Sequence, residues 1–96
     1  MPRLQFTQRA KNDLDRLTDF LLGQSQAIAE STTELVIDGL QILKQHPRIG
    51  RMRSDGLREL VISRGKTGYV ALYRYDEIRD TARVLAIRHQ RELGEI

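Results

Sequence analysis

The sequence predicts an α+β domain in which a helical hairpin covers one face of an antiparallel sheet. Apolar residues recur at helical spacing through the first half of the chain. In the second half they form short strand-like stretches separated by glycine-bearing or charged segments. The 96 residues suffice for one hydrophobic core, so we expect a single domain over residues 1–96 with the order β-α-α-β-β-β.

The first helix is predicted by one apolar face. A short strand over Leu4 to Phe6 leads to Thr7, whose hydroxyl suits an N-cap. The charged residues that follow, Asp13 among them, are assigned to the other faces of an amphipathic helix. The apolar positions recur at spacings of four, three and four: Ala10, Leu14, Leu17 and Leu21.

A second helix follows the break at Gly23 to Gln26. It begins near Ile28, continues through apolar positions to Leu43, and ends at His46-Pro47, because a residue before proline is disfavoured in the helical region. Two helices joined by so short a connection predict an antiparallel hairpin.

The second half of the chain predicts a three-stranded antiparallel meander. A polar loop over residues 48–56 precedes it, and two short connections, residues 64–68 and 76–80, have the length of hairpin loops. The three predicted strands are Leu57 to Ser63, Tyr69 to Tyr75, and Thr81 to Arg88.

The positive charge is concentrated in the second half. Residues 1–45 carry 5 basic and 6 acidic side chains, whereas residues 46–96 carry 11 and 7, and ten of those eleven are arginine. The planar guanidinium suits phosphate or carboxylate recognition, so an anionic partner is expected.

Several function classes are disfavoured by composition. The chain has no cysteine and only two histidines, His46 and His89, so we expect no metal centre and no cofactor. It has no apolar run long enough to span a bilayer, and its opening MPRLQF lacks the apolar core of a signal peptide. A cytoplasmic location without membrane contact is therefore expected.

An ordered set of short motifs resembles the RelE/ParE toxin superfamily, and within it the ParE branch. The set covers nearly the whole chain: an AxxxL helix at 10–14, HPRIGR at 46–51, RELVI at 58–62, GYVALYR at 68–74 and VLAIRHQRE at 84–92. The resemblance implies the toxin of a bacterial type II toxin-antitoxin module, held inactive by a cognate antitoxin in a hetero-oligomer. It also implies the fold predicted above.

Within this superfamily, the resemblance leaves two activities. ParE-type toxins inhibit DNA gyrase by binding, and RelE-type toxins cut messenger RNA in the ribosome. Val70 follows Gly68-Tyr69 where the nucleases carry an arginine, and no tyrosine follows Arg91. This favours a gyrase-binding toxin that is not an enzyme. The alternative is a ribosome-dependent endonuclease that uses His89 and Arg91.

A third reading is a DNA-associated module, which the basic charge alone suggests and which predicts salt-sensitive DNA binding without toxicity. Direct binding of nucleic acid is left open.

Two surfaces are predicted to bind partners. One is a cationic cluster where the last strand ends, which contacts the target or acidic residues of the antitoxin. It comprises Arg64, Lys66, Arg88, His89 and Arg91. The other is an apolar groove that accepts an antitoxin helix or strand, although core packing explains its residues equally well. These residues are Leu14, Leu21, Ile28 and Leu35.

Overall fold

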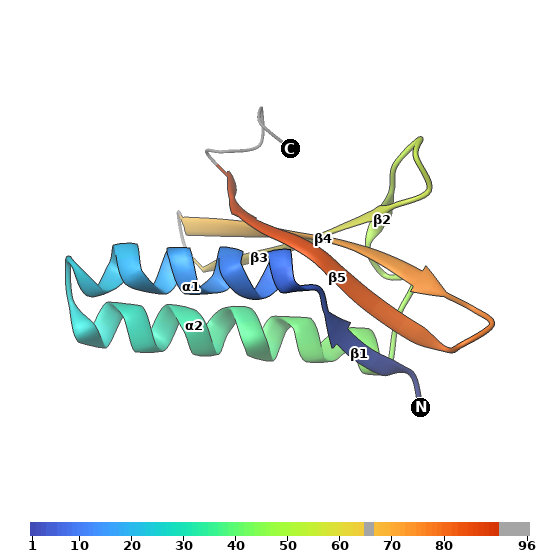
Figure 1. The fold of residues 1–96 in the computed structure, drawn as a ribbon, viewed down its shortest axis with the longest axis horizontal. Coiled ribbons are helices and arrows are strands. Elements are labelled where there is room, and N and C mark those ends of the chain that lie inside the picture. The colour runs from blue at the N-terminus through green and yellow to red at the C-terminus, as the bar shows by residue number, and fades with distance from the viewer. Residues whose placement is uncertain (65–66, 91–96) are drawn as a thin grey trace.

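The computed structural model describes residues 1–64 and 67–90 (Figure 1). A short strand is followed by two antiparallel helices, a 3-10 turn and four further strands. The elements are β1 (Arg3–Phe6), α1 (Gln8–Leu22), α2 (Gln26–Leu40), the 3-10 turn η1 (Gln41–Lys44), β2 (Arg51–Met52), β3 (Arg58–Arg64), β4 (Thr67–Asp76) and β5 (Thr81–His89).

The strands form one sheet in the order β1-β5-β4-β3-β2, and both helices lie on the same face of it (Figure 1). β1 runs parallel to β5, and the other neighbours are antiparallel. Leu72 pairs with Ala86 and Tyr73 with Val84, so Leu85 is an extra residue in β5. Such a bulge bends its strand and increases the local twist.

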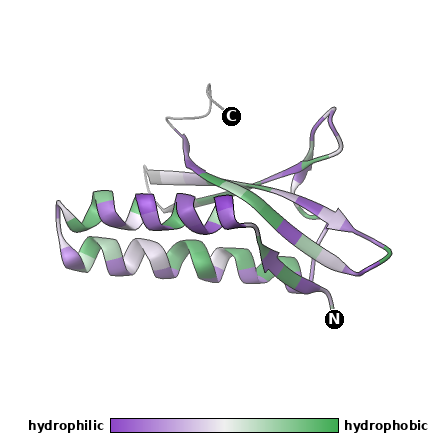
Figure 2. Ribbon diagram, viewed as in Figure 1, coloured by the Kyte–Doolittle hydropathy of each residue, from purple (hydrophilic) through white to green (hydrophobic). Residues whose placement is uncertain are grey.

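The core lies between the helices and the sheet. In Figure 2 the hydrophobic residues of α2 and β5 are green, and the outer side of α1 is mostly hydrophilic. The largest fully buried side chains are those of Tyr73, Leu40, Leu43, Ile87, Val36, Val70 and Val84. In the described part of the chain, no helix has both the length and the apolar character needed to cross a bilayer.

Both helices begin where an N-cap is available. The Thr7 hydroxyl accepts from the Ala10 amide, and the Ser25 hydroxyl accepts from the Ile28 amide. Gly39 lets α2 approach the sheet closely, because a Cβ there would lie 3.0 Å from the Ile62 side chain.

The predicted α+β fold is confirmed, with three differences in detail. β1 joins the sheet in parallel to β5, so the sheet is mixed. α2 ends at Leu40 and continues only as the 3-10 turn, and β2 lies inside the segment predicted to be a loop. A two-residue strand is too short to leave a periodic signal.

The predicted position of Asp13 is wrong. It lies on the buried face of α1 with 7% of its surface exposed. Asp13 is three residues after Ala10 and four before Leu17, both of which are buried, so helical geometry places it on their face.

The loop after η1 is fixed by Tyr73. The Tyr73 hydroxyl donates to the Pro47 carbonyl and accepts from the Gly50 amide, both at 2.8 Å. Arg58 donates to the carbonyls of Arg48 and Gly50. A Cβ at Gly50 would lie 2.6 Å from the Tyr73 ring, so this approach requires glycine.

Candidate functional site

The end of β5 is held by α1. β1 pairs with β5 only as far as Phe6 and Val84, so the rest of that edge needs other hydrogen-bond partners. The Thr7 hydroxyl donates to the Leu85 carbonyl at 3.2 Å, and the Ile87 amide donates to Asp13 Oδ2 at 3.0 Å. Thus Thr7, the N-cap of α1, and Asp13 within α1 supply the hydrogen bonds that a neighbouring strand would otherwise make, just before the predicted functional segment begins.

Asp13 also binds the first cation of that segment. Its Oδ1 lies 2.5 Å from Arg88 Nη1, and the two side chains are only 9% and 16% exposed. Arg88 Nη1 donates a further hydrogen bond to the Ile87 carbonyl at 3.1 Å. Asp13 thus accepts a hydrogen bond from the backbone amide of Ile87 and binds the side chain of the next residue, Arg88.

His89 lies against a tyrosine of the neighbouring strand. It is paired with Tyr69 in the β4–β5 register, and the two rings meet edge to face at 5.3 Å between centroids. Burial raises the pKa of Tyr69, and a hydrogen bond with Thr32 of α2 opposes this shift. The His89 ring is therefore placed by a packed tyrosine that is tied to the helical layer.

The structure places only part of the predicted cationic cluster. Arg88 and His89 are adjacent at the end of β5, whereas Lys66 and Arg91 lie outside the described residues. Arg64 ends β3, but its side chain is not among those described. The convergence of these cations thus stays a prediction.

Asp13 is the site residue that the sequence reading missed. The signal was a carboxylate in the apolar phase of a helix, since a buried carboxylate requires a cation or several hydrogen bonds. Arg88 supplies the cation.

The sheet face turned away from the helices is mainly apolar at this end. Val61, Val70 and Arg88 are cross-strand neighbours in β3, β4 and β5. Val61 is half exposed and Val70 is buried. Arg88, the cation in this row, is paired with Asp13.

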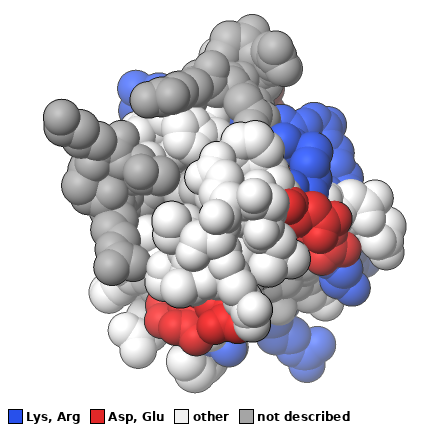
Figure 3. All heavy atoms as spheres, turned by 90° about the vertical axis from the view of Figure 1, so that its left-hand side faces the viewer, with Lys and Arg blue, Asp and Glu red and all other residues white. Residues whose placement is uncertain are grey.

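The predicted antitoxin groove does not present its four residues equally. Leu14 and Leu35 pack against the core, and Leu21 is half-buried. Ile28 is 48% exposed, and two apolar residues of α1 at the same end of the hairpin are also exposed, Phe20 at 66% and Leu22 at 48%. The face at the α1–α2 connection is largely uncharged (Figure 3). Binding of an antitoxin there stays a prediction.

Comparison with known protein families identifies one that covers nearly the whole chain. Residues 4–94 match the family described as ParE toxin of type II toxin-antitoxin system, parDE. A curated relative, Toxin RelE3 of Caulobacter vibrioides, is 34% identical over 92 residues, which are 96% of this chain and 98% of that protein.

Solved structures share the fold. A chain of the chromosomal ParDE toxin-antitoxin system from P. aeruginosa has a TM-score of 0.76 at 22% identity, covering 93% of this chain and 96% of that one. A chain of the RelBE2 complex from Mycobacterium tuberculosis has a TM-score of 0.61 at 27% identity, covering 94% and 100%. A chain of the E. coli RelBE complex has a TM-score of 0.60 at 15% identity, covering 92% and 95%. From the family match and the curated relative, the chain belongs to the ParE toxin family of type II toxin-antitoxin systems.

Proposed function

We propose that this toxin inhibits DNA gyrase by binding, without catalysing a reaction, and that a cognate antitoxin neutralises it. The observation that carries the proposal is the row Val61, Val70 and Arg88. Cleavage of RNA requires cations to stabilise a phosphorane and groups to move protons. In this row two positions are aliphatic, and the arginine is engaged by Asp13.

The antitoxin part of the proposal is supported by the neighbours, several of which are complexes of a toxin with its antitoxin. The exposed apolar residues near the α1–α2 connection also suit a protein partner, because they would leave water on binding.

A second candidate function is ribosome-dependent cleavage of messenger RNA. The relative named Toxin RelE3 favours it. In this case His89 and Arg91 are the residues that we propose to act on RNA. The His89 ring packs against the Tyr69 ring at nearly a right angle, and Arg91 lies outside the described residues.

The test compares both activities at the same toxin concentrations. We expect the toxin to stop purified gyrase from supercoiling a relaxed plasmid, or to make gyrase accumulate cleaved DNA. Messenger RNA in a translation reaction should stay intact. Toxin saturated with its antitoxin is the control and should leave supercoiling unchanged. Intact supercoiling together with cut messenger RNA would overturn the gyrase proposal and establish the second function.

A further inference from the structure

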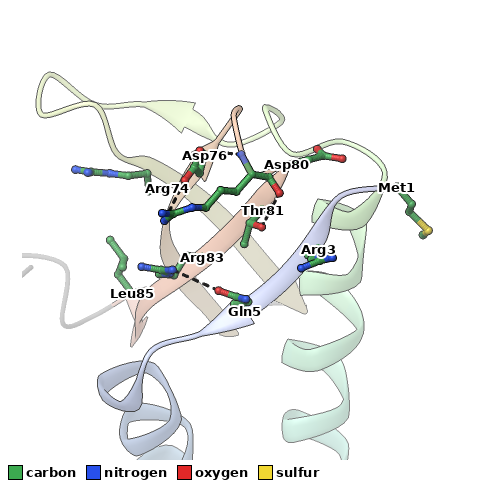
Figure 4. Close-up of a pocket in the computed structure, with 10 residues that line it drawn as sticks. Met1, Arg3, Gln5, Arg74, Asp76, Asp80, Thr81, Arg83 and Leu85 are labelled. Atoms are coloured by element: carbon green, nitrogen blue, oxygen red, sulfur yellow. Dashed lines mark hydrogen bonds and ion pairs between the residues drawn. The ribbon is translucent and has the colours of Figure 1, made fainter.

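A groove lined by arginines lies at the opposite end of β5 from Arg88. It has a volume of about 970 Å³ and is formed by β1, the start of β5, the end of β4 and the loop between them (Figure 4). Its lining includes four arginines and two aspartates, a formal net charge of +2: Arg3, Arg74, Arg79, Arg83, Asp76 and Asp80.

Two of these arginines lie directly opposite each other on adjacent strands. Arg74 of β4 and Arg83 of β5 are paired in the register, so their side chains leave the same face at neighbouring positions. Both residues are exposed. Like charges directly opposite each other on a sheet are destabilising. An anion that binds both guanidinium groups would convert this repulsion into attraction.

The two aspartates do not neutralise this pair. Asp80 accepts a hydrogen bond from the Tyr75 hydroxyl. Asp76 accepts a hydrogen bond from the Arg79 amide, and its carboxylate lies 3.9 Å from the Arg79 guanidinium. Within residues 1–64 and 67–90, the partner of the Arg83 guanidinium is the uncharged amide oxygen of Gln5, at 3.4 Å. Among the described residues, neither Arg3 nor Arg74 has an acidic side chain within ion-pair distance.

The composition of the groove favours a peptide over a nucleic acid. Met1 and Leu85 add apolar surface, and the described lining contains no aromatic side chain on which a base could stack. Asp76 and Asp80 would repel an unbroken row of phosphates at the hairpin end, whereas a peptide can place a neutral or basic residue there. Guanidinium groups bind carboxylates through paired hydrogen bonds.

We infer that Arg3, Arg74 and Arg83 bind carboxylate side chains of an acidic segment of the antitoxin. This inference rests on the antitoxin part of the proposed function and is independent of the target. It adds a contact on the sheet face, separate from the apolar end of the helical hairpin and from the end of β5.

The test uses poly-L-glutamate as the probe and the purified antitoxin encoded beside this toxin as a second ligand. Arg74→Gln/Arg83→Gln should weaken the binding of both about tenfold or more at moderate salt. Arg9→Gln/Lys11→Gln removes the same charge from the exposed side of α1 and should change neither by more than about twofold.

A stability measurement separates loss of a binding site from misfolding. Because Arg74 and Arg83 repel each other, Arg74→Gln should keep or raise the melting temperature of the free toxin while weakening its binding to poly-L-glutamate. Unchanged binding of both ligands by the groove variant would overturn the inference. So would loss of oligonucleotide binding with poly-L-glutamate binding retained.

The outcomes also separate this inference from the proposed target. If the groove variant loses antitoxin binding and the wild-type toxin leaves gyrase unaffected, the gyrase proposal fails and the groove assignment stands. If gyrase is inhibited and the groove variant binds antitoxin normally, the groove assignment fails and the gyrase proposal stands.

Discussion

Asp13 on α1 and Arg88 on β5, 75 positions apart in the sequence, form a buried ion pair in which Oδ1 and Nη1 are 2.5 Å apart. The other carboxylate oxygen accepts the Ile87 amide. One side chain therefore joins the first helix to the end of the last strand. This contact holds the end of β5 against α1.

Asp13→Asn should lower the free energy of unfolding by about 3 kcal/mol. The substitution removes the anionic partner Asp13 from the largely buried guanidinium of Arg88, and breaking a buried pair from one side costs about 3–5 kcal/mol. Urea unfolding measures the change. Asp15→Asn, on the exposed side of the same helix, should cost less than about 0.5 kcal/mol.

A double-mutant cycle tests whether the two residues act together. Asp13→Asn/Arg88→Gln should cost clearly less than the sum of the two single substitutions, because each single substitution already breaks the contact between the two side chains. Additive costs would contradict the ion pair as the cause.

Tyr73→Phe should destabilise the toxin by about 1–3 kcal/mol. It leaves the buried Gly50 amide without its acceptor and the Pro47 carbonyl without its donor. Tyr75→Phe is the matched control, because it removes a hydroxyl whose partner, Asp80, lies at the edge of the exposed groove. Equal losses for the two variants, measured in urea, would refute a special role for the Tyr73 contacts.

How far the sequence could predict this structure depends on the range of the interaction. Helical spacing identified α1 and α2, and the glycine-bearing and charged connections separated the three long strands. The parallel pairing of β1 with β5 joins residues about 78 positions apart, and no local pattern encodes it. The same holds for the ion pair between Asp13 and Arg88.

The arginine groove illustrates this limit in a candidate site. Arg74 and Arg83 are nine positions apart in the sequence, with a charged loop between them. Only the strand register, which is shifted by the bulge at Leu85, shows that they face each other. In contrast, the absence of an arginine at Val70 was visible in the sequence, because it depends on one position next to Gly68-Tyr69.

Stability should decline above about pH 10. The pKa of each of the three tyrosines is raised in the folded chain, mainly by burial for Tyr69 and Tyr73 and by the hydrogen bond to Asp80 for Tyr75. An unfolded tyrosine ionises near pH 10. The stabilisation is complete below that pH and is lost as the pH rises through the folded pKa values, since the unfolded state releases its protons first.

Ultraviolet titration of tyrosinate checks this prediction. In the folded toxin all three tyrosines should ionise above pH 10, and in denaturant all three should ionise near it. A tyrosine that ionises at its ordinary pKa while circular dichroism shows an intact fold would contradict the raised values.

Ile28→Asp should weaken antitoxin binding about tenfold without destabilising the toxin. Ile28 is half exposed in the first turn of α2, so a protein partner that covers it buries the remaining half of a large aliphatic side chain, worth about 0.8–1.5 kcal/mol. An aspartate in the first turn of a helix is favourable because of the helix dipole, so the free toxin should unfold at the same or a higher temperature. Met52→Asp, at the 55% exposed Met52 of β2 on the opposite edge of the sheet from β1, is the control and should bind antitoxin as the wild type does. Calorimetric titration with the antitoxin distinguishes the cases.

If Ile28→Asp binds normally, the antitoxin does not contact this end of the hairpin. If both variants lose affinity equally, the loss reflects the added charge and not the buried surface.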